Sequence, residues 1–242
     1  MTELLNGVVL LAAFTSRSKA YAQALAAAGL APAYVLTFGD RDLDPPLKVR
    51  QDGQTDLFLP DLSLSLTDTI SRAGWHARQV EAKTCNDPEV AAALAVLRPR
   101  LVIYSGYGGQ LVKAPLFSLG VPILHMHAGW LPDYRGSTTI YYSWLERGEC
   151  GVTAFLLSPG IDEGDLVLRK AYPPPPLGMD VDHVYDGAMR ADVLVNVMRA
   201  WAKTGVLPTP SPQNADGRTF YVIHPVLKHV ALLSREALAG AG

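Results

Sequence analysis

The chain has 242 residues, of which 49 % are hydrophobic and 18 % are charged. This length and composition are sufficient to bury the core of one large α/β domain. The 21 Lys and Arg residues nearly balance the 23 Asp and Glu residues, which leaves a formal net charge of −2. That balance gives no electrostatic reason to expect a nucleic acid as partner.

Two other features exclude further classes of protein. The only cysteines, Cys85 and Cys150, form no CxxC motif, so neither a disulfide framework nor a structural zinc site is expected, and a cytoplasmic location fits best. No apolar run reaches the roughly 18 residues that a membrane-spanning helix requires. The apolar residues 8–14 are followed by Arg17 and Lys19, which favours a core strand over a signal peptide.

Strand-like and helical segments alternate along the chain, a pattern typical of a mostly parallel sheet with helices on both faces. In the first half we expect a strand at 8–14, a helix at 16–28, a strand at 33–38, a surface excursion at 39–66 with at most one short helix, a helix end at 67–73, a strand at 76–81, a helix at 88–97 capped by Asp87, and a strand at 101–105. In the second half we expect a strand at 121–127, a helix at 137–147, a strand at 151–157 with a hairpin partner at 166–171, a long amphipathic helix from 181 to Gly205, and a strand at 219–223 before the apolar segment 226–238. These elements predict a Rossmann-like α/β fold, with a main domain at 1–205 and a C-terminal extension at 206–242 that packs on it.

The candidate site lies at the carboxyl ends of the strands 101–105 and 121–127, because open α/β sheets bind ligands in the crevice there. His125 and His127 stand at i and i+2 of one strand and therefore project to the same face. Asp162, in the loop after the next strand, could orient one imidazole, fix its tautomer and stabilise its protonated form. This grouping suits proton transfer around a tetrahedral intermediate and favours acyl transfer.

Three segments carry a resemblance to a known family. HMHAGWLPDYRG, residues 125–136, resembles the signature Asn-x-His-Pro-Ser-Leu-Leu-Pro-x-Tyr-Arg-Gly of the folate-dependent formyltransferases, with matches at His127, Leu131, Pro132, Tyr134, Arg135 and Gly136. GVTAFLLSPGIDEGDLV, from Gly151, is similar to the family's Gly-Val-Thr strand and Asp-x-Gly loop, with Asp162 and Gly164 at the matching positions. LRPRLVIYSGYGGQLV, from Leu97, resembles the strand and loop that border the folate's pterin ring in that family.

The resemblance implies a Rossmann-like formyltransferase fold, 10-formyltetrahydrofolate as formyl donor, and a catalytic set of His127, Asp162 and His125. His125 stands where the family has Asn, and an imidazole there could serve as an N–H donor to the oxyanion. The implied folate contacts are Tyr107, Gly108, Gln110, Leu111, Val112, Gly160, Ile161 and Asp162. Arg135 either anchors the substrate or clamps a loop. Further departures from the signature are Ala128-Gly129 in place of Pro-Ser and Thr139 where Pro is usual.

The acceptor implied by the resemblance is the amine of a small molecule, an amino sugar or an amino-acid-like metabolite. The roughly 30 residues after the Pro-rich stretch that ends at Pro212 are too few for the tRNA-binding domain that the initiator-tRNA enzymes of this family usually carry. The tail PSPQNADGRTFYVIHP is similar to that of enzymes acting on amino-sugar nucleotides, in which a Gln precedes a Gly and an aromatic strand. The apolar segment 226–238 supports a homodimer or, alternatively, forms a last core element.

Three rival readings remain open at this stage. Water in place of the amine would make the protein a formyltetrahydrofolate hydrolase. A folate-binding or regulatory protein of the same fold could have lost catalysis with the Asn. His125, His127 and Asp162 could also bind zinc or iron as a two-His-one-carboxylate set, although no metal is expected.

Overall fold

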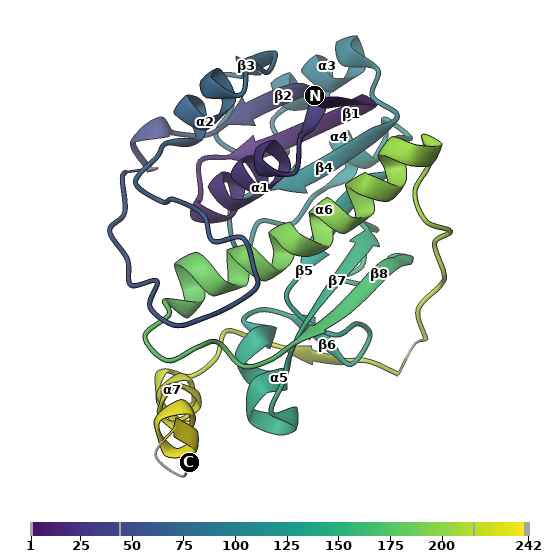
Figure 1. Cartoon of the computed structure of the whole chain (residues 1–242). Coiled ribbons are helices and arrows are strands. Elements are labelled where there is room, and N and C mark those ends of the chain that lie inside the picture. Colours follow the sequence, from purple (N-terminus) through teal and green to yellow (C-terminus); the bar gives the residue numbers. More distant parts are fainter. Residues whose placement is uncertain (1, 44, 215, 240–242) are drawn as a thin grey trace.

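The computed structural model describes residues 2–43, 45–214 and 216–239, and it has a seven-stranded sheet with helices on both faces (Figure 1). The strand order is β3-β2-β1-β4-β5-β7-β8. β1 to β5 pair in parallel, whereas β7 pairs antiparallel with both β5 and β8. The predicted α/β fold is therefore confirmed, including the hairpin at the end of the sheet.

The element bounds follow the predicted ones closely. The strands are β1 Glu3–Ala13, β2 Leu30–Phe38, β3 Ala77–Gln79, β4 Leu101–Ser105, β5 Ile123–His127, β6 Tyr134–Gly136, β7 Cys150–Leu156, β8 Leu166–Tyr172 and β9 Arg218–Phe220. The helices are α1 Ser16–Ala27, α2 Leu66–Arg72, α3 Pro88–Leu97, α4 Ala114–Phe117, α5 Thr139–Arg147, α6 Asp186–Thr204 and α7 Pro225–Ala239, with a 3₁₀ turn η1 at Arg41–Leu43 and a π-helical turn η2 at Val181–Tyr185.

The sheet buries both of its faces. On β1, Val8 and Leu10 pack into the apolar layer beneath α1 and α6, while Val9 and Leu11 pack into the layer beneath α3. Successive strand residues point to opposite faces, so a strand buried on both sides is apolar throughout. In Figure 1, α6 crosses the face of the sheet in front of β4 and β5. The central strands therefore form a rigid base whose carboxyl ends carry the candidate site.

The helix ends show where local sequence rules held and where they did not. The side chain of Thr15 accepts a hydrogen bond from the backbone N–H of Ser18 and caps α1, and Gly205 ends α6 with a positive φ of 72°. Asp87 is the N-cap residue of α3, as predicted, but its side chain makes no capping hydrogen bond. Its carboxylate instead accepts hydrogen bonds from the backbone N–H groups of Lys83 and Thr84, because the chain before α3 folds back over it.

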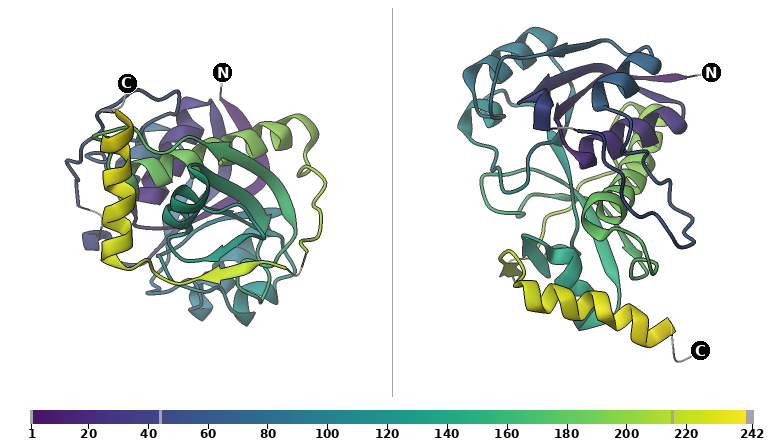
Figure 2. Two further views of the ribbon diagram at one scale, coloured as in Figure 1. Left: turned by 90° about the horizontal axis from the view of Figure 1, so that it is seen from below. Right: turned by 90° about the vertical axis from the view of Figure 1, so that its left-hand side faces the viewer.

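The C-terminal part pairs with a short strand earlier in the chain. β6 was not predicted, and it pairs in parallel with β9 to form a separate two-stranded sheet. The apolar segment 226–238 is a helix, α7, which lies at the lower end of the molecule in the right-hand view of Figure 2. Between α6 and β9, Ser211 forms an antiparallel bridge with Leu166 of β8. Within the described ranges, none of the helices has the length and apolar character needed to cross a bilayer.

Candidate functional site

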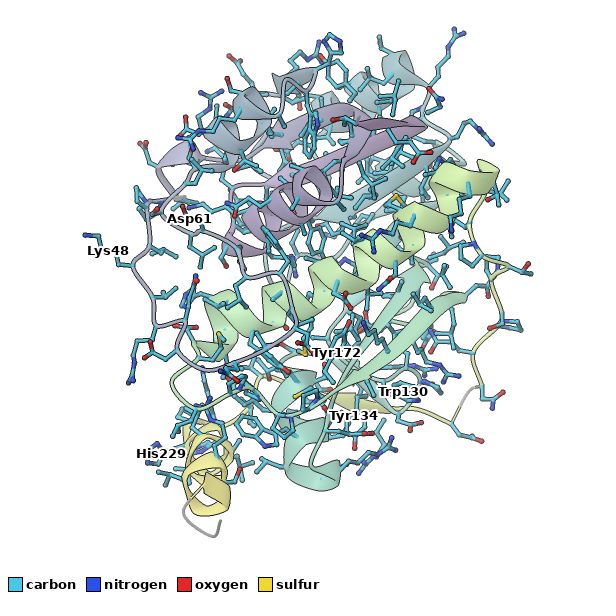
Figure 3. The ribbon with its side chains drawn as sticks, in the orientation of Figure 1. Lys48, Asp61, Trp130, Tyr134, Tyr172 and His229 are labelled. Carbon is cyan, nitrogen blue, oxygen red and sulfur yellow. The ribbon has the colours of Figure 1, made fainter. Side chains whose placement is uncertain are left out.

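β5 brings the two predicted histidines to one face of the sheet. Both rings pack edge-on against Phe155 of the neighbouring strand β7, with ring centroids 5.9 Å away for His125 and 6.4 Å away for His127. The chain then leaves β5 in a tight loop to β6. Figure 3 labels Trp130 of this loop and Tyr134, the first residue of β6, both below α6, and the Trp130 ring lies against Arg169 of β8. The i, i+2 argument from the sequence therefore describes the real arrangement of the two imidazoles.

His127 is buried, and contacts on one ring nitrogen fix its tautomer. Its Nε2 lies 2.7 Å from the carbonyl oxygen of Tyr134 and 3.2 Å from Oγ1 of Thr139. The Thr139 hydroxyl donates its own proton to the carbonyl of Ala128, so its oxygen is free to accept from the ring. Because Nε2 faces two acceptors, it carries the proton, and the neutral ring presents a lone pair at Nδ1.

Nδ1 of His127 faces the carboxylate of Asp162, with a separation of 3.5 Å from Oδ2. A lone pair and a carboxylate oxygen repel at this distance, whereas a proton placed on Nδ1 makes the contact attractive. Burial lowers the pKa of His127, and the negative charge of Asp162 acts in the opposite direction. The pair can therefore take up one proton and release it.

Asp162 is held in an uncommon backbone conformation. Its φ of 54° lies in the left-handed region, which non-glycine residues adopt uncommonly and aspartate more readily than most. The backbone N–H of Gly136 donates to Oδ2 at 2.8 Å. Since Gly136 belongs to β6, the two-stranded sheet fixes the direction of the carboxylate.

His125 occupies a different electrostatic environment. Its Nδ1 lies 3.3 Å from the carbonyl oxygen of Tyr104, and since a carbonyl only accepts, the ring supplies the proton of this bond. Burial lowers the pKa of His125 well below its usual value, and the positive charges of Arg17 and Arg190 lower it further. The ring is neutral at pH 7, and this tautomer presents Nε2 as an acceptor.

Two arginines from the helices border the same site. Arg190 of α6 pairs with Asp186 one turn earlier, with 2.8 Å between Nε and Oδ2, and donates to the carbonyl of Met126. Arg17 of α1 donates to the carbonyl of Gly106 at the end of β4. These contacts place guanidinium groups beside both imidazoles, and sequence reasoning missed the role of Arg190.

Two of the residues expected to contact folate, Leu111 and Val112, line an open groove. This groove has a volume of about 520 Å³, and its lining also includes Pro159, which precedes the expected contacts Gly160 and Ile161. Gln110 does not line this groove, and its Oε1 accepts a hydrogen bond from the Tyr104 hydroxyl at 3.3 Å. Tyr107 packs edge-on against Phe38, with ring centroids 6.0 Å apart.

Arg135 is buried and binds the C-terminal segment. Its Nη2 donates to Oε1 of Gln213 at 3.4 Å and to the carbonyl of Asn214 at 3.1 Å, and its Nη1 lies 3.8 Å from Glu163. These contacts match the alternative in which Arg135 clamps a loop. A contact between Arg135 and the substrate stays a prediction. In the described part of the chain, no group of three or more His, Cys, Asp or Glu side chains is arranged to hold a metal ion.

Comparisons with known proteins show the family of the chain. The model of the formyl transferase family matches residues 58–192. The methionyl-tRNA formyltransferase of Chloroflexus aurantiacus is 32 % identical over 136 residues, which are 54 % of this chain and 43 % of that protein. The enzyme of the same name from Moorella thermoacetica is 32 % identical over 162 residues, 64 % of this chain and 45 % of that protein. The chain thus matches less than half the length of these relatives.

Solved structures share the fold. Glycinamide ribonucleotide transformylase 1 from Symbiobacterium toebii superposes with a TM-score of 0.56 at 18 % identity, covering 88 % of this chain and 95 % of that one. A sugar N-formyltransferase from Shewanella sp. superposes with a TM-score of 0.57 at 15 % identity, covering 94 % and 87 %. At these identities the likeness is one of fold.

Proposed function

Because the chain belongs to the formyl transferase family, we propose that it transfers the formyl group of 10-formyltetrahydrofolate to the amine of a small molecule. The observation that carries the proposal is the His127–Asp162 pair at the carboxyl end of β5, 3.5 Å apart. An open groove lined by Leu111, Val112 and Pro159 offers apolar walls for the flat ring of the donor.

Formyl transfer requires two proton movements. The uncharged amine attacks the formyl carbon, the carbon–nitrogen bond to the donor breaks, the amine nitrogen loses a proton, and the donor nitrogen gains one. In the proposal, the His127–Asp162 pair takes the proton from the amine and returns it to the leaving nitrogen through water. While Nδ1 is protonated, the imidazolium also stabilises the oxyanion formed from the formyl oxygen, and Asp162 stabilises that charged ring.

His125 has a complementary role in the proposal. With Nδ1 bonded to the Tyr104 carbonyl, the neutral ring can accept a hydrogen bond at Nε2 from the attacking amine and hold its lone pair toward the formyl carbon. A neutral ring that donated from Nε2 to the oxyanion, as the sequence resemblance implies, would have to give up its Nδ1 bond to the Tyr104 carbonyl. The low pKa of His125 supports a neutral ring in either case.

The acceptor we propose is an amino sugar or an amino-acid-like metabolite. The net charge of −2 supports a small molecule over a polyanionic partner. Cys85 and Cys150 are free and buried, which supports a reducing cytoplasmic location. A homodimer stays a prediction, and α7 exposes Val226 and Val230 to solvent.

Formyl release in the presence and absence of amines tests the proposal. The purified protein is mixed with 10-formyltetrahydrofolate and a panel of amino sugars and amino acids, and tetrahydrofolate is followed by absorbance and formylated product by mass spectrometry. We expect product with at least one amine and none with His127→Ala. Amine-independent release of formate would indicate a hydrolase, and donor binding without turnover would indicate a folate-binding protein. Either result would overturn the proposed transfer.

A further inference from the structure

The segment after α6 returns to the site from far along the sequence. In Figure 1 it descends beside β8 and runs back below the sheet to β6. Ser211 and Leu166 exchange two backbone hydrogen bonds of 2.9 and 2.8 Å, and β9 then pairs with β6. Gln213 lies between these two attachments, so its backbone is fixed on both sides.

The side chain of Gln213 binds the loop that carries Asp162. Its Nε2 donates to the carbonyl of Asp162 at 3.0 Å and to the carbonyl of Gly164 at 2.6 Å. Its Oε1 accepts a hydrogen bond from Arg135. Each polar atom of this partly buried amide therefore has a partner, and two of the three bonds end on the loop 162–164.

This loop needs such an external restraint. Asp162 has a left-handed φ of 54°, a conformation that costs free energy for a residue with a Cβ. A carbonyl held by Gln213 fixes the peptide plane after Asp162, and the N–H of Gly136 fixes the carboxylate. Together the two contacts direct Oδ2 toward Nδ1 of His127.

We propose that Gln213 is a positioning residue, which holds the Asp162 loop so that the carboxylate stays directed at His127. The inference rests on the proposed formyl transfer for its effect on rate, but the contact itself is independent of the substrate. It also makes the segment after α6 part of the catalytic site, although no residue of that segment is proposed to touch the reacting atoms.

The kinetic test replaces Gln213 with Met, which is also unbranched and of similar length but has no amide donors. We expect kcat for formyl transfer to fall by about 10- to 100-fold, with KM for the amine nearly unchanged, because small displacements of a catalytic group cost rates of this order. Asn214→Ala is the matched control: its side chain is exposed, and its bond to Arg135 comes from the backbone. We expect wild-type kcat for this control.

A second readout needs no turnover. NMR titration of ¹⁵N-labelled His127 reports the pKa of the imidazole, which Asp162 raises and which Arg190, Asp186 and His125 also influence. We expect Gln213→Met to lower the pKa of His127 in the direction that Asp162→Asn does. In the Asp162→Asn background, Gln213→Met is expected to have no further effect, since the carboxylate through which it acts is gone.

The outcomes separate this inference from the proposed function. If the wild-type protein transfers no formyl group but Gln213→Met still lowers the pKa of His127, the positioning role stands and the proposed function falls. If a folded Gln213→Met variant keeps the wild-type pKa of His127, the positioning role is overturned, whatever its rate. If Gln213→Met fails to fold, Gln213→Glu, which still accepts from Arg135 but cannot donate to the loop, is tested for the same loss of kcat.

Discussion

Gly129 lies where the close contact between His127 and Tyr134 leaves no room for a side chain. A Cβ added at this position would lie 2.5 Å from Nε2 of His127 and 2.5 Å from the carbonyl oxygen of Tyr134. Both distances are at least half an ångström below the 3.0 Å that real Cβ contacts respect. Gly129→Ala must therefore separate the two atoms whose hydrogen bond fixes the tautomer of His127.

The size of the effect follows from this overpacking. Forcing a methyl group into a well-packed site costs about 1–3 kcal/mol. In a chain of this length each kcal/mol lowers the unfolding midpoint by about 2–4 °C, so we expect a decrease of roughly 2–12 °C. Because Nε2 also loses the nearer of its two acceptors, the Tyr134 carbonyl, kcat for formyl transfer is expected to fall by at least about 10-fold, more than the stability change alone would cause.

The assays are thermal unfolding by circular dichroism and formyl transfer at a temperature at which the variant is folded. Gly108→Ala is the stability control, since a Cβ there meets nothing within 4 Å. Equal unfolding midpoints for Gly129→Ala and Gly108→Ala, together with wild-type kcat in Gly129→Ala, would refute the reasoning from packing.

Three further predictions follow from the same structure. His127→Ala and Asp162→Ala are each expected to lower kcat by at least about 100-fold with little change in the unfolding midpoint. His125→Asn is expected to retain measurable transfer. Wild-type kcat in either Ala variant would contradict the assignment of the catalytic pair. The depressed pKa of His125 means that, at low pH, the unfolded chain binds a proton that the folded chain does not. The free energy of unfolding should therefore fall as the pH drops below about 6.5. Urea unfolding measured at several pH values should show a less steep fall in His125→Asn than in the wild type. If the exposed face of α7 forms a homodimer, Val230→Asp should convert the dimer to monomer in sedimentation, whereas a monomeric wild type would exclude that interface.

The strands and helices that carry the site were predicted well from the sequence, because their local residue patterns and their burial in the fold favour the same structure. α3 and β4 were predicted at their observed bounds, since an apolar run between turn residues determines a buried strand. His125 and His127 could be placed on one face because the side-chain period of a strand is fixed. The proximity of Asp162 to His127 followed from the resemblance and from the order of the strands.

The contacts that orient these groups could not be predicted in the same way. β6 has only three residues and has no sequence pattern of its own, because its pairing partner β9 lies about 80 residues later. The Gln–Gly spacing of the tail was visible in the sequence, but nothing local indicated that the amide of Gln213 would bind the carbonyl of Asp162. Long-range polar contacts of this kind depend on the packed fold and carry no periodic signal.

The departures from the family signature after His127 depend on one another. Gly129 leaves the space in which the Tyr134 carbonyl approaches Nε2, and Thr139 places a hydroxyl oxygen on the same nitrogen while donating to the Ala128 carbonyl. A proline at 139 would have no hydroxyl, and a serine at 129 would collide with the ring. Gly129→Ser or Thr139→Pro alone should therefore disturb the position of His127. The serine would fill the space beside Nε2, and the proline would remove the hydroxyl that contacts Nε2.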